Sequence, residues 1–153
     1  MIVFRLSKSR FARDLSGKGA EIAGGRWNSK GIPVVYTGES RALCVTEIAV
    51  HTELGNLPED YQLISIEIPD EVTICKIATE DLPVNWSSIP HMAGTQMLGD
   101  ERLMTSDCAV IRVPSAVVPG DFNYLLNPRH RDSAKINIIK IEDFSFDKRL
   151  FVR

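Results

Sequence analysis

The alternation of apolar and polar residues at 64–68, within the segment 61–68, is the feature that most limits what this chain can fold into. Three isoleucines in that stretch alternate with Ser65 and Glu67. A period of two residues places the isoleucines on one face of a strand and the polar residues on the other. The segment is therefore predicted to be a half-buried strand.

Other short apolar segments predict further strands, and no glycine-rich turn of the dinucleotide-binding type joins a strand to a helix. Strands are expected at 2–6, 34–37, 108–113 and 135–141, with short edges at 144–146 and 150–152, and helices at 40–51 and 92–104. These strands are too short and too irregularly connected for repeating strand–helix–strand units, so a Rossmann domain is disfavoured. The pattern favours an α+β fold with mixed, partly split β-sheets and short helices, in a single domain spanning 1–153.

The composition is that of a globular protein and argues against two classes of function. The net charge is −2, from 18 basic and 20 acidic residues, with no long basic run, so direct nucleic-acid binding is not expected. No stretch approaches the roughly 18 apolar residues needed to cross a bilayer, and Arg5 interrupts any N-terminal signal sequence. A cytoplasmic location away from membranes is expected.

The spacing of cysteine and histidine predicts neither a disulfide framework nor a metal site. Cys44, Cys75 and Cys108 are odd in number, far apart and set in apolar surroundings. They are expected to be reduced core thiols of a cytosolic protein. The three histidines have no metal-ligand spacing with one another or with the cysteines, so no metal is expected.

Glu47 is a carboxylate inside an apolar helix, and packing alone explains it poorly. Ser40 is a good N-cap and no Gly or Pro interrupts the residues that follow, which predicts a helix. The apolar residues from Ala42 to Val50 point all round its axis, which is typical of a buried helix. Because an unpaired buried carboxylate is costly, Glu47 needs a cation, several donors or a shifted pKa. It is therefore a site residue, half of a buried structural ion pair, or a side chain that reaches solvent at the edge of the helix.

Residues 24–28 read Gly-Gly-Arg-Trp-Asn and predict a turn that can hold an anion. Glycines let a ligand approach the main chain closely, and Arg26 carries a permanent charge on a fork of donors suited to phosphate. Trp27 is expected to anchor the turn. The alternatives are a solvated loop cation for Arg26 and a plain core role for Tyr36, which ends the apolar run 33–36.

Two polar residues in the C-terminal half complete the set. Ser115 follows an apolar strand, where its hydroxyl can face a cleft or simply form a turn. No Gly-x-Ser-x-Gly motif or neighbouring histidine supports a Ser–His nucleophile. Asn123 begins the segment 123–128, which can equally be a turn anchored by its leucines.

Taken in order, these motifs resemble the RES-domain family, which is named for an arginine, a glutamate and a serine. The resemblance runs from about Val3 to Leu150. The matching segments are Phe4-Arg5-Leu6, Gly24-Gly25-Arg26-Trp27-Asn28, Val35-Tyr36-Thr37, Glu47, Val113-Pro114-Ser115, Asn123-Tyr124-Leu125-Leu126-Asn127-Pro128 and Phe146-Asp147-Lys148-Arg149-Leu150.

The resemblance implies a bacterial toxin of a type II toxin–antitoxin pair that consumes NAD, with a fold similar to ADP-ribosyltransferase toxins. NAD would be its substrate, with no cofactor. Its partner would be an Xre-like antitoxin with a helix-turn-helix-like region and a segment that blocks the NAD pocket.

The resemblance also implies roles for the candidate residues. Cleavage of the nicotinamide–ribose bond passes through an oxocarbenium-like state, which the fixed charge of Glu47 would stabilise. Arg26, with Arg5, would hold the pyrophosphate, and Tyr36 would stack on the nicotinamide or close the pocket around it. Ser115 would hydrogen-bond a ribose or amide group, and Asn123 would line the site.

Two further readings stay open on the sequence alone. The acceptor can be water, inorganic phosphate or a protein side chain, which makes the enzyme a glycohydrolase, a phosphorylase or a protein ADP-ribosyltransferase. The protein can also be a non-enzymatic binding module in which Arg26 and Glu47 form a buried structural pair.

Overall fold

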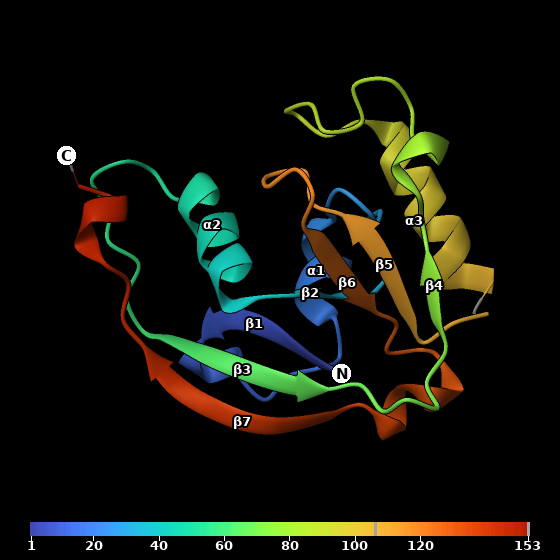
Figure 1. The fold of residues 1–153 in the computed structure, drawn as a ribbon, viewed down its shortest axis with the longest axis horizontal. Coiled ribbons are helices and arrows are strands. Elements are labelled where there is room, and N and C mark those ends of the chain that lie inside the picture. The colour runs from blue at the N-terminus through green and yellow to red at the C-terminus, as the bar shows by residue number, and fades with distance from the viewer. Residues whose placement is uncertain (106, 153) are drawn as a thin grey trace.

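Seven strands form one mixed sheet in the computed structural model, which describes residues 1–105 and 107–152. The order across the sheet is β4-β5-β6-β2-β1-β3-β7, and every neighbouring pair is antiparallel except β4 with β5 (Figure 1). The strands are β1 (Ile2–Lys8), β2 (Val35–Gly38), β3 (Tyr61–Glu67), β4 (Ile74–Lys76), β5 (Val110–Pro114), β6 (Phe122–Leu126) and β7 (Asn137–Phe144).

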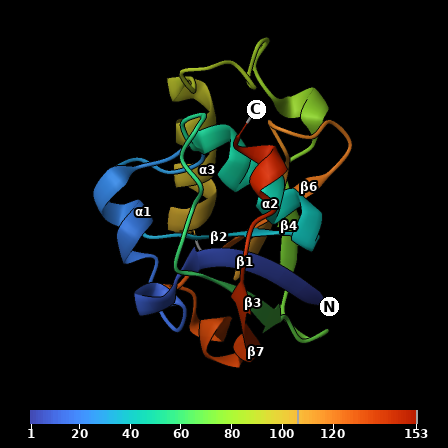
Figure 2. The same ribbon diagram turned by 90° about the vertical axis from the view of Figure 1, so that its left-hand side faces the viewer.

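The α-helices of the described residues are α1 (Lys18–Ala23), α2 (Arg41–His51) and α3 (Ala93–Thr105). Short 3₁₀ turns lie at Ser9–Phe11, Thr79–Asp81, Arg131–Lys135 and Lys148–Leu150. In both views α2 and α3 lie toward one end of the molecule and β7 toward the other (Figure 2). No helix of the described residues is long and apolar enough to cross a membrane.

The sheet is nearly divided between β1 and β2. These two strands pair at one position, Phe4 with Gly38, whereas β1 and β3 are in register along their whole length. The strand predicted at 61–68 is confirmed as β3, with Ile64 and Ile66 fully buried. The expectation that it is half-buried is wrong over its centre, because Leu63 and Ser65 on the other face are only 3% and 4% exposed. The observed architecture therefore confirms the predicted α+β class with a partly split sheet.

Different residues and helices pack against the two faces of the sheet. One face carries Val3, Val35, Ile64 and Tyr124 in a core cluster that spans both halves of the sheet. On the other face, α2 covers Leu6 and Leu63, while Trp27 packs over β5 and β6. Helix α2 and the turn that carries Trp27 therefore lie on the same face of the sheet.

Helix α2 begins where the sequence predicts. The Ser40 hydroxyl accepts a hydrogen bond from the Leu43 amide at 3.0 Å, as an N-cap does. The expectation that this helix is buried all round is wrong, because Val50 is 54% exposed and the fully buried residues are Leu43 and Cys44. The helix meets the sheet on one side only.

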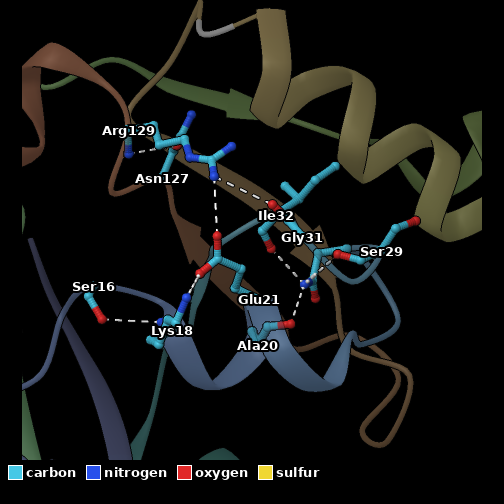
Figure 3. A network of polar contacts seen from close by, with 10 residues as sticks. Ser16, Lys18, Ala20, Glu21, Ser29, Gly31, Ile32, Asn127 and Arg129 are labelled. Carbon is cyan, nitrogen blue, oxygen red and sulfur yellow. Dashed lines mark hydrogen bonds and ion pairs between the residues drawn. The ribbon is translucent and has the colours of Figure 1, made fainter.

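An ion-pair chain fixes the start of the Gly24–Asn28 turn against the end of β6 (Figure 3). Glu21, on α1, accepts hydrogen bonds from Lys18 at 2.7 Å and from Arg129 at 3.2 Å. Arg129 also donates to the Gly31 carbonyl at 3.4 Å.

Helix α1 and strands β4 and β6 were not predicted as such from the sequence, and the chain at 150–152 does not form the expected edge strand.

The expectation of three separate thiols is wrong for two of the cysteines. Cys75, in β4, and Cys108, just before β5, form a disulfide with 5.9 Å between their Cα atoms. The parallel pairing of β4 with β5 brings them together across 33 residues of sequence. Cys44 is a free, buried thiol.

Candidate active site

Four of the predicted site residues come from elements that meet on the face of the sheet covered by α2. The register pairs Tyr36 with Leu125, and Asn123 with both Gly38 and Val113. Cross-strand neighbours share a face, so Tyr36 and Asn123 lie on the same side as α2. Ser115 directly follows β5, and Figure 1 shows the turn after β5, α2 and the chain before α3 at the same end of the molecule.

Glu47 is half-buried and held by hydrogen-bond donors. The Ser115 hydroxyl donates to Glu47 Oε1 at 3.4 Å. The Asn123 amide donates to Thr37 O at 3.4 Å, and hydrogen bonding from the same side chain lowers the pKa of the Glu47 carboxyl. Burial raises the pKa of Glu47, while these hydrogen bonds and the nearby charges of His51 and Arg26 act in the opposite direction. The carboxylate is therefore fixed in place, with its charged form partly desolvated.

The Ser115 hydroxyl is fully used inside the protein. It accepts hydrogen bonds from the Val117 and Val118 amides at 3.1 and 3.0 Å and donates its single proton to Glu47. A hydroxyl has one donor and two acceptor positions, so none is left for a ligand. These hydrogen bonds arrange Ser115 to orient the Glu47 carboxylate.

The Tyr36 hydroxyl is likewise engaged. It accepts from the Trp27 amide at 3.0 Å and donates to Asn28 Oδ1 at 2.8 Å. Gly25 makes this approach possible, because a Cβ at that position would lie 2.6 Å from the hydroxyl oxygen. Burial raises the pKa of Tyr36 far above its usual range, so the phenol stays protonated. Only the ring of Tyr36 remains to face a ligand.

The Gly24–Asn28 turn is held in place by side-chain hydrogen bonds. Asn28 is fully buried, and its amide donates to the carbonyls of Ala20 and Ile32 at 2.8 and 2.9 Å. Gln96, on α3, donates to the carbonyls of Gly25 and Asn28 at 2.9 and 3.3 Å. Trp27 is 3% exposed, which confirms its predicted role as the anchor.

Arg26 projects from this turn and is tied to main-chain carbonyls. Its Nη1 donates to Trp86 O at 2.7 Å and to Ser88 O at 3.2 Å, and its Nη2 also donates to Ser88 O at 3.2 Å. Burial lowers the pKa of Arg26, and the charge of nearby Glu47 acts in the opposite direction. Arg26 and Glu47 do not form an ion pair. A buried structural pair of these two residues is therefore not what the structure contains.

Arg5 lies apart from the other predicted site residues. It pairs with Ile64 in the sheet, on the face opposite to α2, and its Nη1 donates to Asp14 O at 2.6 Å. Burial lowers the pKa of Arg5, and the nearby charge of Asp14 acts in the opposite direction. The alternation of β1 turns Phe4 toward α2 and Arg5 away from it, so the structure does not bring Arg5 to the candidate site.

Sequence reasoning missed the residues that support the turn. The carbonyls of Trp86 and Ser88 carry no sequence signal, because any residue has one. Gln96 and Asp100 are four residues apart on α3, and Asp100 accepts hydrogen bonds from the amide and hydroxyl of Ser29. That spacing on a helix was the available signal for a polar stripe facing the turn. Two surface hollows, lined around His130 and around Leu82, contain none of the predicted site residues, although Asp100 lines the second.

A model of the RES domain matches residues 2–147. This chain belongs to the RES domain family. The Prs ADP-ribosylating toxin of Sphingobium sp. (strain YBL2) is 40% identical over 141 residues, which cover 91% of this chain and 88% of that toxin. Toxin Res of Photorhabdus laumondii is 39% identical over 153 residues, covering 98% and 97%.

The fold is also similar to a solved structure, the M. tuberculosis MbcT–MbcA toxin–antitoxin complex. The TM-score is 0.73 at 21% identity, with 98% of this chain and 86% of that chain covered. At this level of identity the likeness is one of fold, and it agrees with the fold class predicted from the sequence.

Proposed function

We propose that this RES-domain protein is the toxin of a type II toxin–antitoxin pair and that it cleaves the nicotinamide–ribose bond of NAD. The observation that carries the proposal is the half-buried carboxylate of Glu47, held by Ser115 and Asn123 with Arg26 close by. Relatives named as toxins are 36–40% identical over at least 88% of their own length.

The chemistry of this bond suits a single carboxylate. Nicotinamide leaves as a neutral group because it already carries a positive charge in NAD, so no general acid has to protonate it. Positive charge develops on the ribose as the bond breaks, and a fixed negative charge beside it lowers the barrier. Glu47 would supply that charge, and its two donors would keep it aimed without an ion pair that neutralises it.

The other residues would position the substrate. The Arg26 guanidinium would bind the pyrophosphate, because a planar fork of donors fits phosphate oxygens in pairs. The Tyr36 ring would form a wall for the nicotinamide, since its hydroxyl is occupied. Asn123 would hold Glu47 and line the ribose pocket beside it. Ser115 would act through Glu47.

The acceptor distinguishes two candidate reactions. With water or inorganic phosphate, an acceptor oxygen forms the new bond to the ribose carbon while nicotinamide departs, and NAD is degraded. With a protein side chain as acceptor, the ADP-ribose is transferred to a target protein. The second candidate is favoured by the name of the Sphingobium relative, an ADP-ribosylating toxin.

The partner would be an antitoxin that covers the NAD pocket in the cytoplasm. The similar fold of MbcT was solved as a toxin–antitoxin complex, which supports a partner of that kind. The antitoxin is expected to be Xre-like.

Incubation of the purified protein with NAD, with and without phosphate, tests the reaction directly. Free nicotinamide together with ADP-ribose, ADP-ribose 1″-phosphate or a modified protein identifies water, phosphate or a side chain as acceptor. Expression without a partner should lower cellular NAD and stop growth. Normal growth and steady NAD alongside abundant folded protein would refute the proposal.

A further inference from the structure

Residues 83–91 connect the 3₁₀ turn at Thr79–Asp81 to α3 and contact the turn that carries Arg26. In Figure 1 this segment rises above α3 and extends toward α2. No described strand pairs with it, and its main-chain hydrogen bonds among the described residues form two short turns, from the Trp86 amide to Pro83 O and from the Ser88 amide to Asn85 O. Val84 and Ile89 are 85% and 89% exposed. The segment therefore has little of its own structure to hold it in place.

The contacts that do hold the segment come from the candidate site. Arg26 makes three hydrogen bonds to its carbonyls, at 2.7, 3.2 and 3.2 Å. The Trp86 ring lies 6.0 Å from the ring of Trp27, centroid to centroid. His91, at its end, is 3.2 Å from the Gln96 side chain, which also binds the Gly24–Asn28 turn. The segment is fastened to the same turn that presents Arg26.

The hydrogen bonds of Arg26 use both hydrogens of Nη1 and one hydrogen of Nη2, which together form one side of the guanidinium. Nη1 and Nη2 both point to Ser88 O, and the remaining Nη1 hydrogen points to Trp86 O. The opposite edge, formed by Nε and the second Nη2 hydrogen, has no partner among the described residues. This edge is a planar pair of donors, the geometry that takes two oxygens of one phosphate.

We propose that Arg26 serves two partners at once, one edge fixing residues 83–91 as a wall of the site and the other taking a phosphate of the dinucleotide. The inference rests on the proposed NAD chemistry for the identity of the ligand. A neutral carbonyl on one edge does not cancel the charge of the guanidinium, so the free edge still attracts an anion. Phosphate binding and placement of the wall then reinforce each other, because both hold the same side chain in the same orientation.

Hydrogen exchange of the Trp86 and Ser88 amides tests both halves of the proposal. In the unliganded protein, Arg26→Ala should speed their exchange by about tenfold or more, since hydrogen bonds that fasten the segment are lost. Arg26→Lys should give an intermediate rate, because one ammonium cannot reproduce both edges. Arg131→Ala, an exposed arginine far along the chain, is the matched control and should change nothing.

Ligand binding should slow the same amides further. The measurement uses NAD with the Glu47→Gln protein, so that the dinucleotide is not consumed during exchange. A second readout is turnover of wild-type and Trp86→Ala proteins, where loss of the wall should raise KM for NAD severalfold and leave kcat within about twofold.

The possible outcomes separate this inference from the proposed function. NAD should slow amide exchange in the Glu47→Gln protein and should have no such effect when Arg26 is also replaced. This result supports the proposal that Arg26 binds the segment and the phosphate at once. NAD that binds and is turned over while exchange in residues 83–91 stays constant or accelerates overturns the wall and leaves the NAD chemistry standing. Unaltered exchange in unliganded Arg26→Ala shows that Arg26 does not hold residues 83–91 in place. No binding and no turnover of NAD by any of the proteins refutes the proposed function and this inference with it.

Discussion

The substitution Glu47→Gln distinguishes a catalytic carboxylate from a structural one. The two roles predict different losses in the free energy of unfolding. Glutamine keeps the shape and can accept the hydrogen bond from either Ser115 or Asn123, so about one bond worth roughly 0.5–1.5 kcal/mol is lost. Removing a half-buried charge works in the opposite direction, because burial raises the pKa of Glu47 and disfavours its ionised form. The free energy of unfolding should therefore change by less than about 1 kcal/mol. Half of a buried ion pair would instead cost about 3–5 kcal/mol.

The effect of Glu47→Gln on turnover should be far larger. Deleting a preorganised charge that faces the developing cation should slow NAD cleavage by about 10² to 10³, or roughly 2.7–4 kcal/mol in activation free energy. The assay is release of nicotinamide at saturating NAD, together with urea unfolding and NAD binding of the same protein. Glu67→Gln, an exposed carboxylate on β3, is the control and should behave as wild type. A stable Glu47→Gln protein that cleaves NAD at the wild-type rate would refute the mechanism.

Three further predictions follow from the contacts of the site. Arg26→Ala should weaken NAD binding by about 1.5–3 kcal/mol, measured by calorimetry on the Glu47→Gln background, with partial recovery in Arg26→Lys; unchanged affinity in both would remove Arg26 from the site. Gly99→Ala should destabilise the protein by about 1–3 kcal/mol in thermal or urea unfolding, because a Cβ there collides with the Trp27 carbonyl; wild-type stability would contradict the close packing of α3 on the turn. Because the pKa of Glu47 is raised above its usual 4.5, turnover should fall with decreasing pH through a midpoint above that value. For the same reason, raising the pH through that midpoint should lower the free energy of unfolding of wild type relative to that of Glu47→Gln. A turnover midpoint at or below 4.5 would contradict the raised pKa.

Local patterns allowed much of the fold to be predicted. The alternation at 61–68 and the cap at Ser40 depend on neighbours in sequence, and both elements form where expected. Strand β4 is three residues long and is stabilised by pairing with β5 across more than 30 residues, which no local pattern reveals. The same long-range pairing joins Cys75 to Cys108, so their distance in sequence was a poor guide to their distance in space.

The candidate site was predictable to the extent that its residues are chemically unusual. Glu47 was recognisable as a lone charge in an apolar helix, and Arg26 as a charge beside two glycines. Arg5 was placed with them because of its motif, yet the side of a strand on which a residue lies depends on the register of the whole sheet. The partners of Arg26 are carbonyl oxygens of a segment about 60 residues away, which have no signature in the sequence.

The engaged hydroxyls of the site change what each named residue can do. A serine and a tyrosine beside a carboxylate suggest direct contacts to a sugar, but the hydrogen bonds of Ser115 and Tyr36 are complete within the protein. Rigid neutral groups of this kind hold charges in place, and preorganised charge is what lowers the barrier for a cationic transition state. The groups left to meet a ligand are the Glu47 carboxylate with Asn123 beside it, one edge of Arg26 and the ring of Tyr36. In the proposed function, the negative charge would face the ribose, the pair of donors would bind the pyrophosphate, and the aromatic ring would form a wall for the nicotinamide of one dinucleotide.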